Sequence, residues 1–230
     1  MIRIQNLQAL LIKQIKDTLK NPPVLVFFLV YPIIAFVMSS AMKGQEGAGA
    51  FISIFATMHC VFSPAVVASS ILSEEKEGNT LRVLIMSNVT LREYFISIGG
   101  FVLIATVASG SIFLFITEKD FVGSIIFILS LGLGSFISII LGLCISLYAK
   151  NASAANGIAV PCGMIFAFLP MLANFNKSIE NVSRFTFGQQ VSYLLGKGSI
   201  SIFGIIVISV NTILLAILAS VLFRKSLAEE

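Results

Sequence analysis

The sequence predicts an all-α, polytopic membrane protein with six transmembrane helices, an amphipathic helix at its N-terminus and one short cytoplasmic helix. Two observations carry this prediction, the composition and the positions of the charges. Of 230 residues, 57% are hydrophobic and only 11% are charged, and the mean hydropathy is +0.99. A soluble domain has roughly 25% charged residues, so the composition excludes a water-soluble globule. The 20 phenylalanines exclude a disordered chain, which is poor in aromatic residues.

Six stretches contain no Asp, Glu, Lys or Arg, at residues 21–42, 47–73, 94–117, 121–149, 151–176 and 198–223. A helix needs about 20 mostly apolar residues to cross a bilayer, and every stretch is longer. Because lipid offers no hydrogen-bond partners to the backbone, each stretch should be helical. We expect one transmembrane domain over residues 1–230, with spans at about 23–42, 51–73, 94–117, 122–149, 154–174 and 200–223.

The basic residues predict the orientation. If the N-terminus lies in the cytoplasm, ten Lys and Arg residues fall on the inner side and five fall on the outer side, Lys43, Lys119, Lys177, Arg184 and Lys197. This excess satisfies the positive-inside rule and predicts that both termini are cytoplasmic. The net charge of +4 then follows from topology and from contact with anionic membrane lipid, so it does not indicate a nucleic-acid partner.

Residues 1–20 predict an amphipathic helix that lies in the headgroup plane. At about 100° per residue, five apolar side chains share one face, Ile4, Leu7, Leu11, Ile15 and Leu19. The lysines lie opposite, where they can contact lipid phosphates. Pro22 and Pro23 end this helix, because the residue before a proline avoids the helical conformation. The alternative is an ordinary cytoplasmic helix packed on the rest of the protein.

Prolines and small residues within the spans predict how the helices bend and pack. Pro32 and Pro64 each remove one backbone hydrogen bond from their spans and should bend them. Small residues recur at every fourth position of the fourth span, a spacing that allows another helix to approach closely, at Ser130, Gly134, Ser138, Gly142 and Ser146. This stripe packs either within the chain or against a second copy of it.

Residues 185–196, between the fifth and sixth spans, are uncharged and largely apolar. They are too few to cross a bilayer, which needs about 20 residues. We therefore expect short helices here that dip into the outer leaflet or lie along it.

Residues 79–88 predict a short cytoplasmic helix after the second span. Gly78 ends that span, Asn79 or Thr80 can cap the new helix, and Asn88 can end it. The helix is apolar almost all round, through Leu81, Val83, Leu84, Ile85 and Met86. A helix this short is unstable alone in water, and so much apolar surface usually marks an interaction site. We expect it to dock in a groove of a second protein; the alternative is that it rests on lipid.

The segment Glu-Glu-Lys-Glu-Gly-Asn-Thr-Leu-Arg-Val-Leu at 74–84, followed by Leu-Arg-Glu-Tyr at 91–94, resembles the segment after the second span of type-2 permeases of ATP-binding cassette (ABC) transporters. The layout of the whole chain is similar too, with an amphipathic leader, six spans, a coupling helix between spans two and three, and small outer helices between spans five and six. Asn79 stands between Gly78 and Thr80, where the usual run in the family is Gly-Thr-Leu.

This resemblance implies a permease subunit of a prokaryotic ABC exporter in the plasma membrane, working as a homodimer or heterodimer of permease chains. Two ATPase subunits would bind underneath, with the coupling helix in the ATPase groove. We expect the ATPase contact to include Glu75, Glu77, Gly78, Thr80, Leu81, Leu84 and Ile85. Leu84 would be the apolar anchor, and Gly78 the joint at which the helix changes its angle.

The energy source is expected on the partner. The chain has no Gly-x-x-x-x-Gly-Lys-Ser/Thr sequence to cradle phosphates, so ATP and Mg²⁺ should bind the ATPase and no cofactor should bind this chain. One histidine and no carboxylate within the spans predict neither a metal site nor a catalytic site. We expect a transporter subunit and not an enzyme. The alternative is an ion-coupled carrier or channel, although such carriers usually keep a charge in the membrane.

The translocation pathway should be lined by small or polar side chains of the spans. The candidates are His59, Ser63, Ser69, Ser153 and Asn156. His59 is ionisable, which favours a functional role, but it can equally hydrogen-bond a neighbouring helix. A route rich in Phe and Leu and without charges favours an amphipathic or apolar cargo such as a peptide, drug or lipid.

Overall fold

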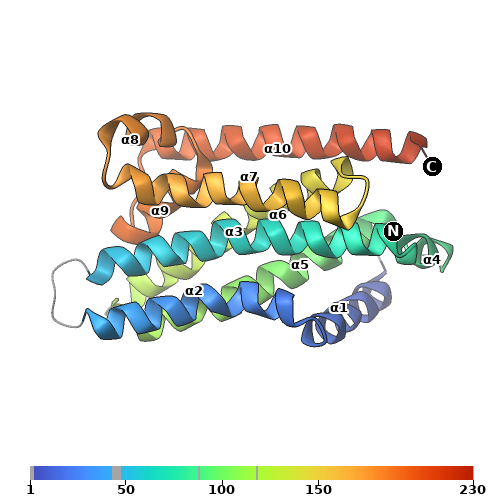
Figure 1. The fold of residues 1–230 in the computed structure, drawn as a ribbon, viewed down its shortest axis with the longest axis horizontal. Helices are drawn as coiled ribbons and strands as arrows, with labels where there is room; N and C mark the ends of the chain where they lie inside the picture. The colour runs from blue at the N-terminus through green and yellow to red at the C-terminus, as the bar shows by residue number, and fades with distance from the viewer. Residues whose placement is uncertain (1–2, 43–47, 88, 118, 230) are drawn as a thin grey trace.

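The computed structural model describes residues 3–42, 48–87, 89–117 and 119–229. Within these ranges the chain is helical and contains no strand (Figure 1). The elements in order are α1 (Ile4–Leu19), α2 (Pro22–Ala41), α3 (Ala48–Glu77), α4 (Thr80–Met86), α5 (Leu91–Gly110), the 3₁₀ turn η1 (Ser111–Phe115), α6 (Phe121–Tyr148), α7 (Ala152–Ala173), α8 (Lys177–Ser183), α9 (Phe187–Lys197) and α10 (Ile202–Glu229).

Six of these helical segments are long and apolar enough to cross a membrane, namely Pro22–Ala41, Phe51–Glu77, Arg92–Phe115, Phe121–Tyr148, Ala152–Ala173 and Ile202–Lys225. The predicted all-α, six-span architecture is therefore confirmed. The helix of the second span is longer than the membrane-crossing range 51–73, since α3 begins at Ala48 and continues to Glu77, next to Gly78, which was expected to end it. The helix thus carries the acidic residues beyond the apolar stretch without a break.

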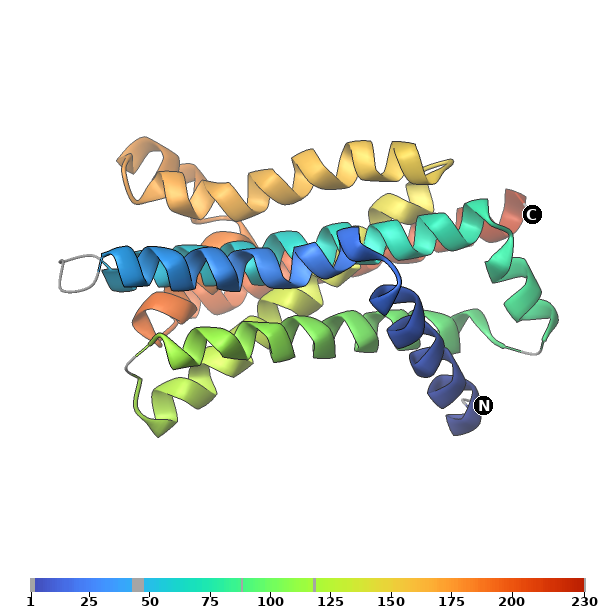
Figure 2. The ribbon, with the colours of Figure 1, turned by 60° about the horizontal axis from the view of Figure 1, so that its bottom comes forward.

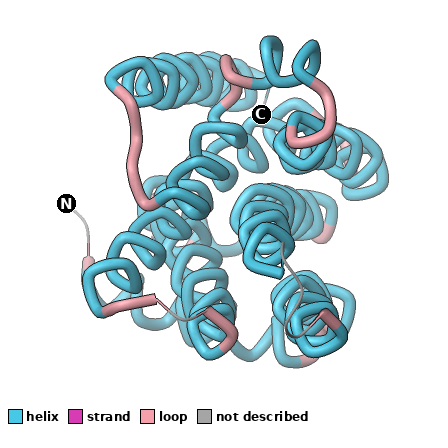
Figure 3. Tube along the Cα trace, turned by 90° about the vertical axis from the view of Figure 1, so that its left-hand side faces the viewer, coloured by secondary structure: helices cyan, strands magenta, loops and turns pink. Residues whose placement is uncertain are grey.

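Helix α3 lies at the centre of the bundle, and α10 lies at its edge. In their most apolar windows, 83% of the α3 residues are buried but only 11% of those of α10 are. Helices α2, α5, α6, α7 and α9 all pack against α3. Figure 3 views this bundle roughly along the helix axes. The exposed apolar faces of α2, α7 and α10 are consequently available to lipid or to another membrane helix.

The small-residue stripe of α6 packs against α3 of the same chain. A side chain at Gly142 would collide with the carbonyl oxygen of Ala65, and one at Gly134 would lie 2.9 Å from Sγ of Cys60. At the last position of the stripe, the hydroxyl of Ser146 accepts a hydrogen bond from the hydroxyl of Ser73 over 3.0 Å. These contacts confirm packing within the chain, one of the two readings that the spacing allowed.

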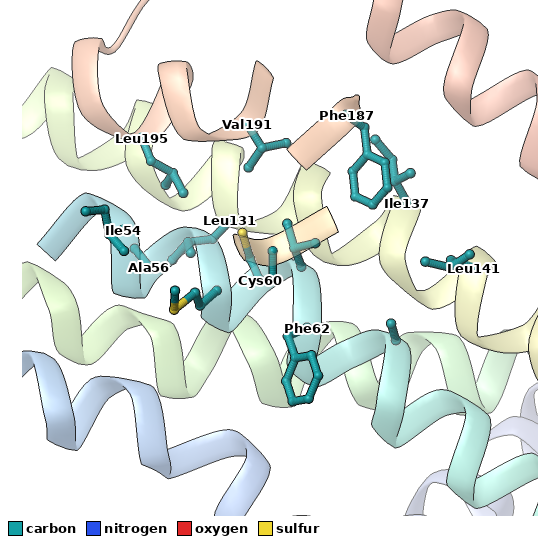
Figure 4. Close-up of a cluster of buried hydrophobic side chains, with 14 of the residues drawn as sticks. Ile54, Ala56, Cys60, Phe62, Leu131, Ile137, Leu141, Phe187, Val191 and Leu195 are labelled. Atoms are coloured by element: carbon teal, nitrogen blue, oxygen red, sulfur yellow. The ribbon is translucent and has the colours of Figure 1, made fainter. Parts of the chain in front are cut away.

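Residues 185–196 fall largely in α9, which lies at the end of the bundle opposite α4 (Figure 1). Thr186 caps the start of the helix, since its hydroxyl accepts a hydrogen bond from the amide of Gln189, and Gly198 caps its end in the left-handed conformation, with φ 67°. Its apolar face, Phe187, Val191 and Leu195, is fully buried against the core around Cys60 and Leu131 (Figure 4). The segment is thus part of the bundle's core.

Helix α1 is inclined to the spans and lies at the same end of the molecule as α4 (Figure 2). One of its faces, Leu10, Gln14 and Thr18, is buried against the bundle. Most of the predicted apolar face remains exposed, including Ile4, Ile15 and Leu19. The helix therefore combines a packed face with an apolar surface that suits the lipid interface.

Candidate functional site

The connection between α3 and α4 turns at Asn79. Helix α3 ends at Glu77, and the amides of Gly78 and Asn79 still donate to the carbonyls of Glu74 and Lys76. Asn79 then adopts φ 56°, a left-handed conformation that asparagine tolerates better than most residues. Gly78 follows the helix as expected, but the residue with the positive φ is Asn79. Gly78 and Asn79 thus form the turn between α3 and α4, and the role of Gly78 as the joint stays a prediction.

Helix α4 covers residues Thr80–Met86, within the predicted 79–88. It begins with a bond from the amide of Val83 to the carbonyl of Asn79, 3.3 Å long. It closes with bonds from the amides of Ser87 and Val89 to the carbonyl of Leu84, each 3.1 Å long. Asn88, the predicted end of the helix, lies outside the described residues.

The apolar surface of α4 is divided between the protein and solvent. Leu84, the predicted anchor for a partner, packs against a core cluster that includes Leu72, Tyr94 and Ile98. Val83 and Met86 point outward, with exposed fractions of 59% and 79%. The side chains of Leu81 and Ile85 lie outside the described set. Among the described side chains of α4, Val83 and Met86 are therefore the exposed apolar ones.

Glu75 is bound by α1. It is only 8% exposed, and its Oε1 accepts hydrogen bonds from Nζ of Lys13 over 2.6 Å and from Nε2 of Gln14 over 2.9 Å. Burial alone would lower the pKa of Lys13, but hydrogen bonds and attraction to Glu75 and Asp17 raise it above the usual 10.5. Glu75 was predicted to contact an ATPase, yet its side chain belongs to the contact between α1 and α3.

Glu93 forms a second link to α1. Its carboxylate accepts from the backbone amide of Arg3 over 2.6 Å and from Nδ2 of Asn6 over 3.1 Å. It also accepts from the amide of Thr90 over 2.8 Å, while the hydroxyl of Thr90 accepts from the amide of Glu93. This capping box starts α5 and at the same time fixes the beginning of α1. Glu93 was not among the predicted functional residues, although Thr-x-x-Glu before an apolar run is the pattern of a capping box.

Lys76 and Glu77, which follow Glu75 at the end of α3, contact two other spans. Nζ of Lys76 donates to the carbonyls of Ser146 and Ala149 at the end of α6, over 3.0 and 3.3 Å. Oε2 of Glu77 accepts from the amide of Ala152 at the start of α7, over 2.9 Å. Residues 75–77 thus connect the end of α3 to α1, α6 and α7. We call this set of contacts the α3 junction.

The predicted pathway residues of α3 lie in the core. The ring nitrogen Nε2 of His59 lies 2.9 Å from the carbonyl oxygen of Thr106 and 3.2 Å from Oγ of Ser109, both on α5. Ser63 donates to the carbonyl of Phe27 on α2 over 2.6 Å, and Ser69 is fully buried. His59 and Ser63 therefore hold neighbouring helices to α3.

The two pathway candidates on α7 have different surroundings. Ser153 is exposed and Asn156 is partly buried, near the start of that helix. The three candidates on α3 are fully buried whereas Ser153 is exposed, so the five do not line one exposed surface of the chain. A pathway that included all five residues would need a surface that this chain alone does not form.

The described residues contain no group of three or more His, Cys, Asp or Glu residues that could hold a metal ion. Neither a known family model nor a curated protein sequence matches the chain. The geometry at the α4 end and the six-span architecture therefore carry the functional argument.

Proposed function

We propose that the chain is the permease subunit of an ABC exporter in the plasma membrane of a prokaryote, with both termini in the cytoplasm. It moves an amphipathic or apolar cargo, such as a peptide, drug or lipid, with ATP that a separate ATPase subunit hydrolyses. A second permease chain, identical or related, completes the transporter. The ATP and Mg²⁺ belong to the partner.

The observation that carries this proposal is the surface of α4. A seven-residue helix exposes Val83 and Met86 beyond the ends of two apolar spans. Such surface costs free energy in water, at about 25 cal/mol per Å² of apolar area, so a docked partner stabilises it. A helix laid in a groove of the ATPase covers these two side chains while Leu84 remains in the permease core.

The α3 junction supports the proposal because its hydrogen bonds connect the segment before α4 to the spans. A displacement of α4 acts on the end of α3, and Glu75, Lys76 and Glu77 connect that end to three other helices. Glu93 holds the start of α5, on the other side of α4, to α1. The end of α3 and the start of α5, on either side of α4, are thus hydrogen-bonded to helices that reach the bilayer.

The spans favour an external motor and an apolar cargo. The charge-free stretches of the sequence leave the interior of every span without Asp, Glu, Lys or Arg, and His59 is the one ionisable histidine there, whereas ion-coupled carriers usually keep a charged residue in the membrane. The outward faces of α2 and α7 are apolar, through residues such as Val26, Phe36 and Ile165. A second permease chain packed on these faces would enclose a route with an apolar lining.

The test is co-expression of the chain with ATP-binding cassette ATPases that are encoded in the same genome. An ATPase encoded by a neighbouring gene is tested first. We expect an ATPase to co-purify with the wild-type chain and Val83→Asp to abolish this. Val182→Asp on α8 is the matched control, because Val182 is 66% exposed but lies at the opposite end of the bundle. It should leave co-purification unchanged.

Transport in sealed vesicles tests the alternative of an ion-coupled carrier or channel. The ATPase proposal predicts that cargo moves only when ATP is supplied together with the co-purified subunit. Movement driven by an ion gradient in ATP-free vesicles, unaffected by Val83→Asp, would exclude the exporter and favour the carrier.

A further inference from the structure

A cavity of about 610 Å³ lies at the end of the bundle opposite α4. The starts of α3 and α8, the end of α7 and helix α9 surround it. Two opposite charges line it, the carboxylate of Glu180 and the ammonium of Lys197. The cavity has no place in the proposed ATPase contact, which lies at the other end of the molecule (Figure 1).

Tyr193 contacts both charged side chains. Its hydroxyl donates to Oε1 of Glu180 over 2.9 Å, and Nζ of Lys197 lies 5.0 Å from the centre of its ring. Burial, followed by the hydrogen bond to Glu180, raises the pKa of Tyr193 above 10.0, so the phenol remains a donor. Among the described residues, Glu180 and Lys197 form no ion pair with each other. Each keeps hydrogen-bonding capacity for a ligand.

The walls of the cavity have a polar and an apolar side. Gln189 is almost fully buried, and its Oε1 accepts from the hydroxyl of Ser183 over 3.0 Å, which fixes the wall beside Tyr193. Phe51, Ile54 and Phe175 contribute aromatic and aliphatic surface near the ends of α3 and α7. The cavity is thus amphipathic and opens where two spans end.

We propose that this cavity binds the zwitterionic headgroup of a phospholipid, with its ammonium against Glu180 and its phosphodiester against Lys197. A ligand carrying both charges matches both side chains, whereas a purely anionic or cationic ligand leaves one of them without a partner. Headgroups lie at the ends of transmembrane helices, and the acyl chains can run along Phe51 and Phe175. The inference goes beyond the exporter proposal and does not depend on it.

The experiment uses the purified full-length chain in detergent and short-chain lipids, with dissociation constants measured by native mass spectrometry. The probes are dihexanoyl phosphatidylethanolamine, dihexanoyl phosphatidylglycerol and free phosphoethanolamine. The variants are Glu180→Gln and Lys197→Gln. Lys177→Gln is the control, since Lys177 is exposed on α8 at the same end and does not line the cavity.

The wild-type chain should bind phosphatidylethanolamine about tenfold more tightly than phosphatidylglycerol, the ratio expected for one charge-assisted hydrogen bond. Glu180→Gln should remove this preference while binding of phosphatidylglycerol persists. Lys197→Gln should weaken both lipids by about tenfold, because it removes the phosphate contact. The control should match the wild type in every measurement.

Three results would overturn the proposal. Equal affinities of the wild type for the two lipids, or a preference that survives Glu180→Gln, would show that Glu180 does not bind the ammonium. Free phosphoethanolamine binding as tightly as the lipid would assign the cavity to a soluble ligand, which contradicts the lipid source. All these outcomes are independent of ATPase binding, so they leave the proposed function untouched.

Discussion

The ammonium of Lys13 and the carboxylate of Glu75 join α1 to the end of α3 across 2.6 Å. Gln14, itself almost fully buried, donates to the same oxygen. Separation of α1 from α3 would leave the buried carboxylate without these partners, which is costly in a poorly solvated position. The two helices therefore should move as one unit at the α4 end.

A double-mutant cycle tests this unit. Lys13→Gln and Glu75→Gln should each lower the free energy of unfolding, and the interaction between them should be about 1 kcal/mol, since the pair is partly exposed. The measurement is unfolding in mixed detergent micelles followed by circular dichroism. Glu74→Gln is the control, because Glu74 is exposed and accepts a bond from Ser70 within α3. Strictly additive effects of the two substitutions would show that the pair does not join the helices.

Glu93→Ala should loosen both α5 and α1. The substitution removes the acceptor of the amides of Thr90 and Arg3, and loss of a helix cap typically costs about 1 kcal/mol. Hydrogen exchange should become faster at residues 3–6 and at 90–94 together. Arg92→Ala, in the same turn but exposed, is the control and should leave exchange at residues 3–6 unchanged. Faster exchange confined to α5 would argue against a link between the two helices.

Gly142→Ala should destabilise the bundle. The new methyl group would meet the backbone carbonyl of Ala65, which cannot move without shifting α3, and such overpacking costs about 1–3 kcal/mol. Gly157→Ala on α7 is the matched control, because nothing lies within 4 Å of the added carbon there. Its effect should be neutral or slightly stabilising, since alanine favours helices over glycine. The measurement is the midpoint of thermal unfolding, which should fall for Gly142→Ala but not for Gly157→Ala. Equal midpoints of the two variants would contradict the prediction.

Much of the fold could be predicted from the sequence because lipid imposes long charge-free helices, and charges mark where they end. The spans, the small-residue stripe and the short helix after α3 all follow from patterns within single segments. The capping box of Thr90 and Glu93 could be read in the same way. Such local features depend on residues only a few positions apart.

The orientation of individual side chains at the α4 end could not be predicted in this way. Glu75 turns inward because Lys13 and Gln14, about sixty residues earlier, lie beside it. Leu84 turns inward because it packs against a cluster that α3 and α5 build together with α1 and α2. Both depend on contacts between distant segments, which an apolar or acidic run does not specify. For the same reason the pattern favoured Leu84 as the anchor, whereas Val83 and Met86 are the exposed apolar side chains among those described in α4.

The claim that α4 docks into an ATPase is tested most directly by a cross-link from its exposed tip. The native cysteines Cys60, Cys144 and Cys162 are first replaced by alanine, and Met86→Cys is then labelled with a photoreactive group. In vesicles containing the co-expressed ATPase, we expect one cross-linked product of permease and ATPase, and none from Val182→Cys on α8. A Met86 probe that reacts with phospholipid alone, while ATP-dependent transport continues, would contradict the account.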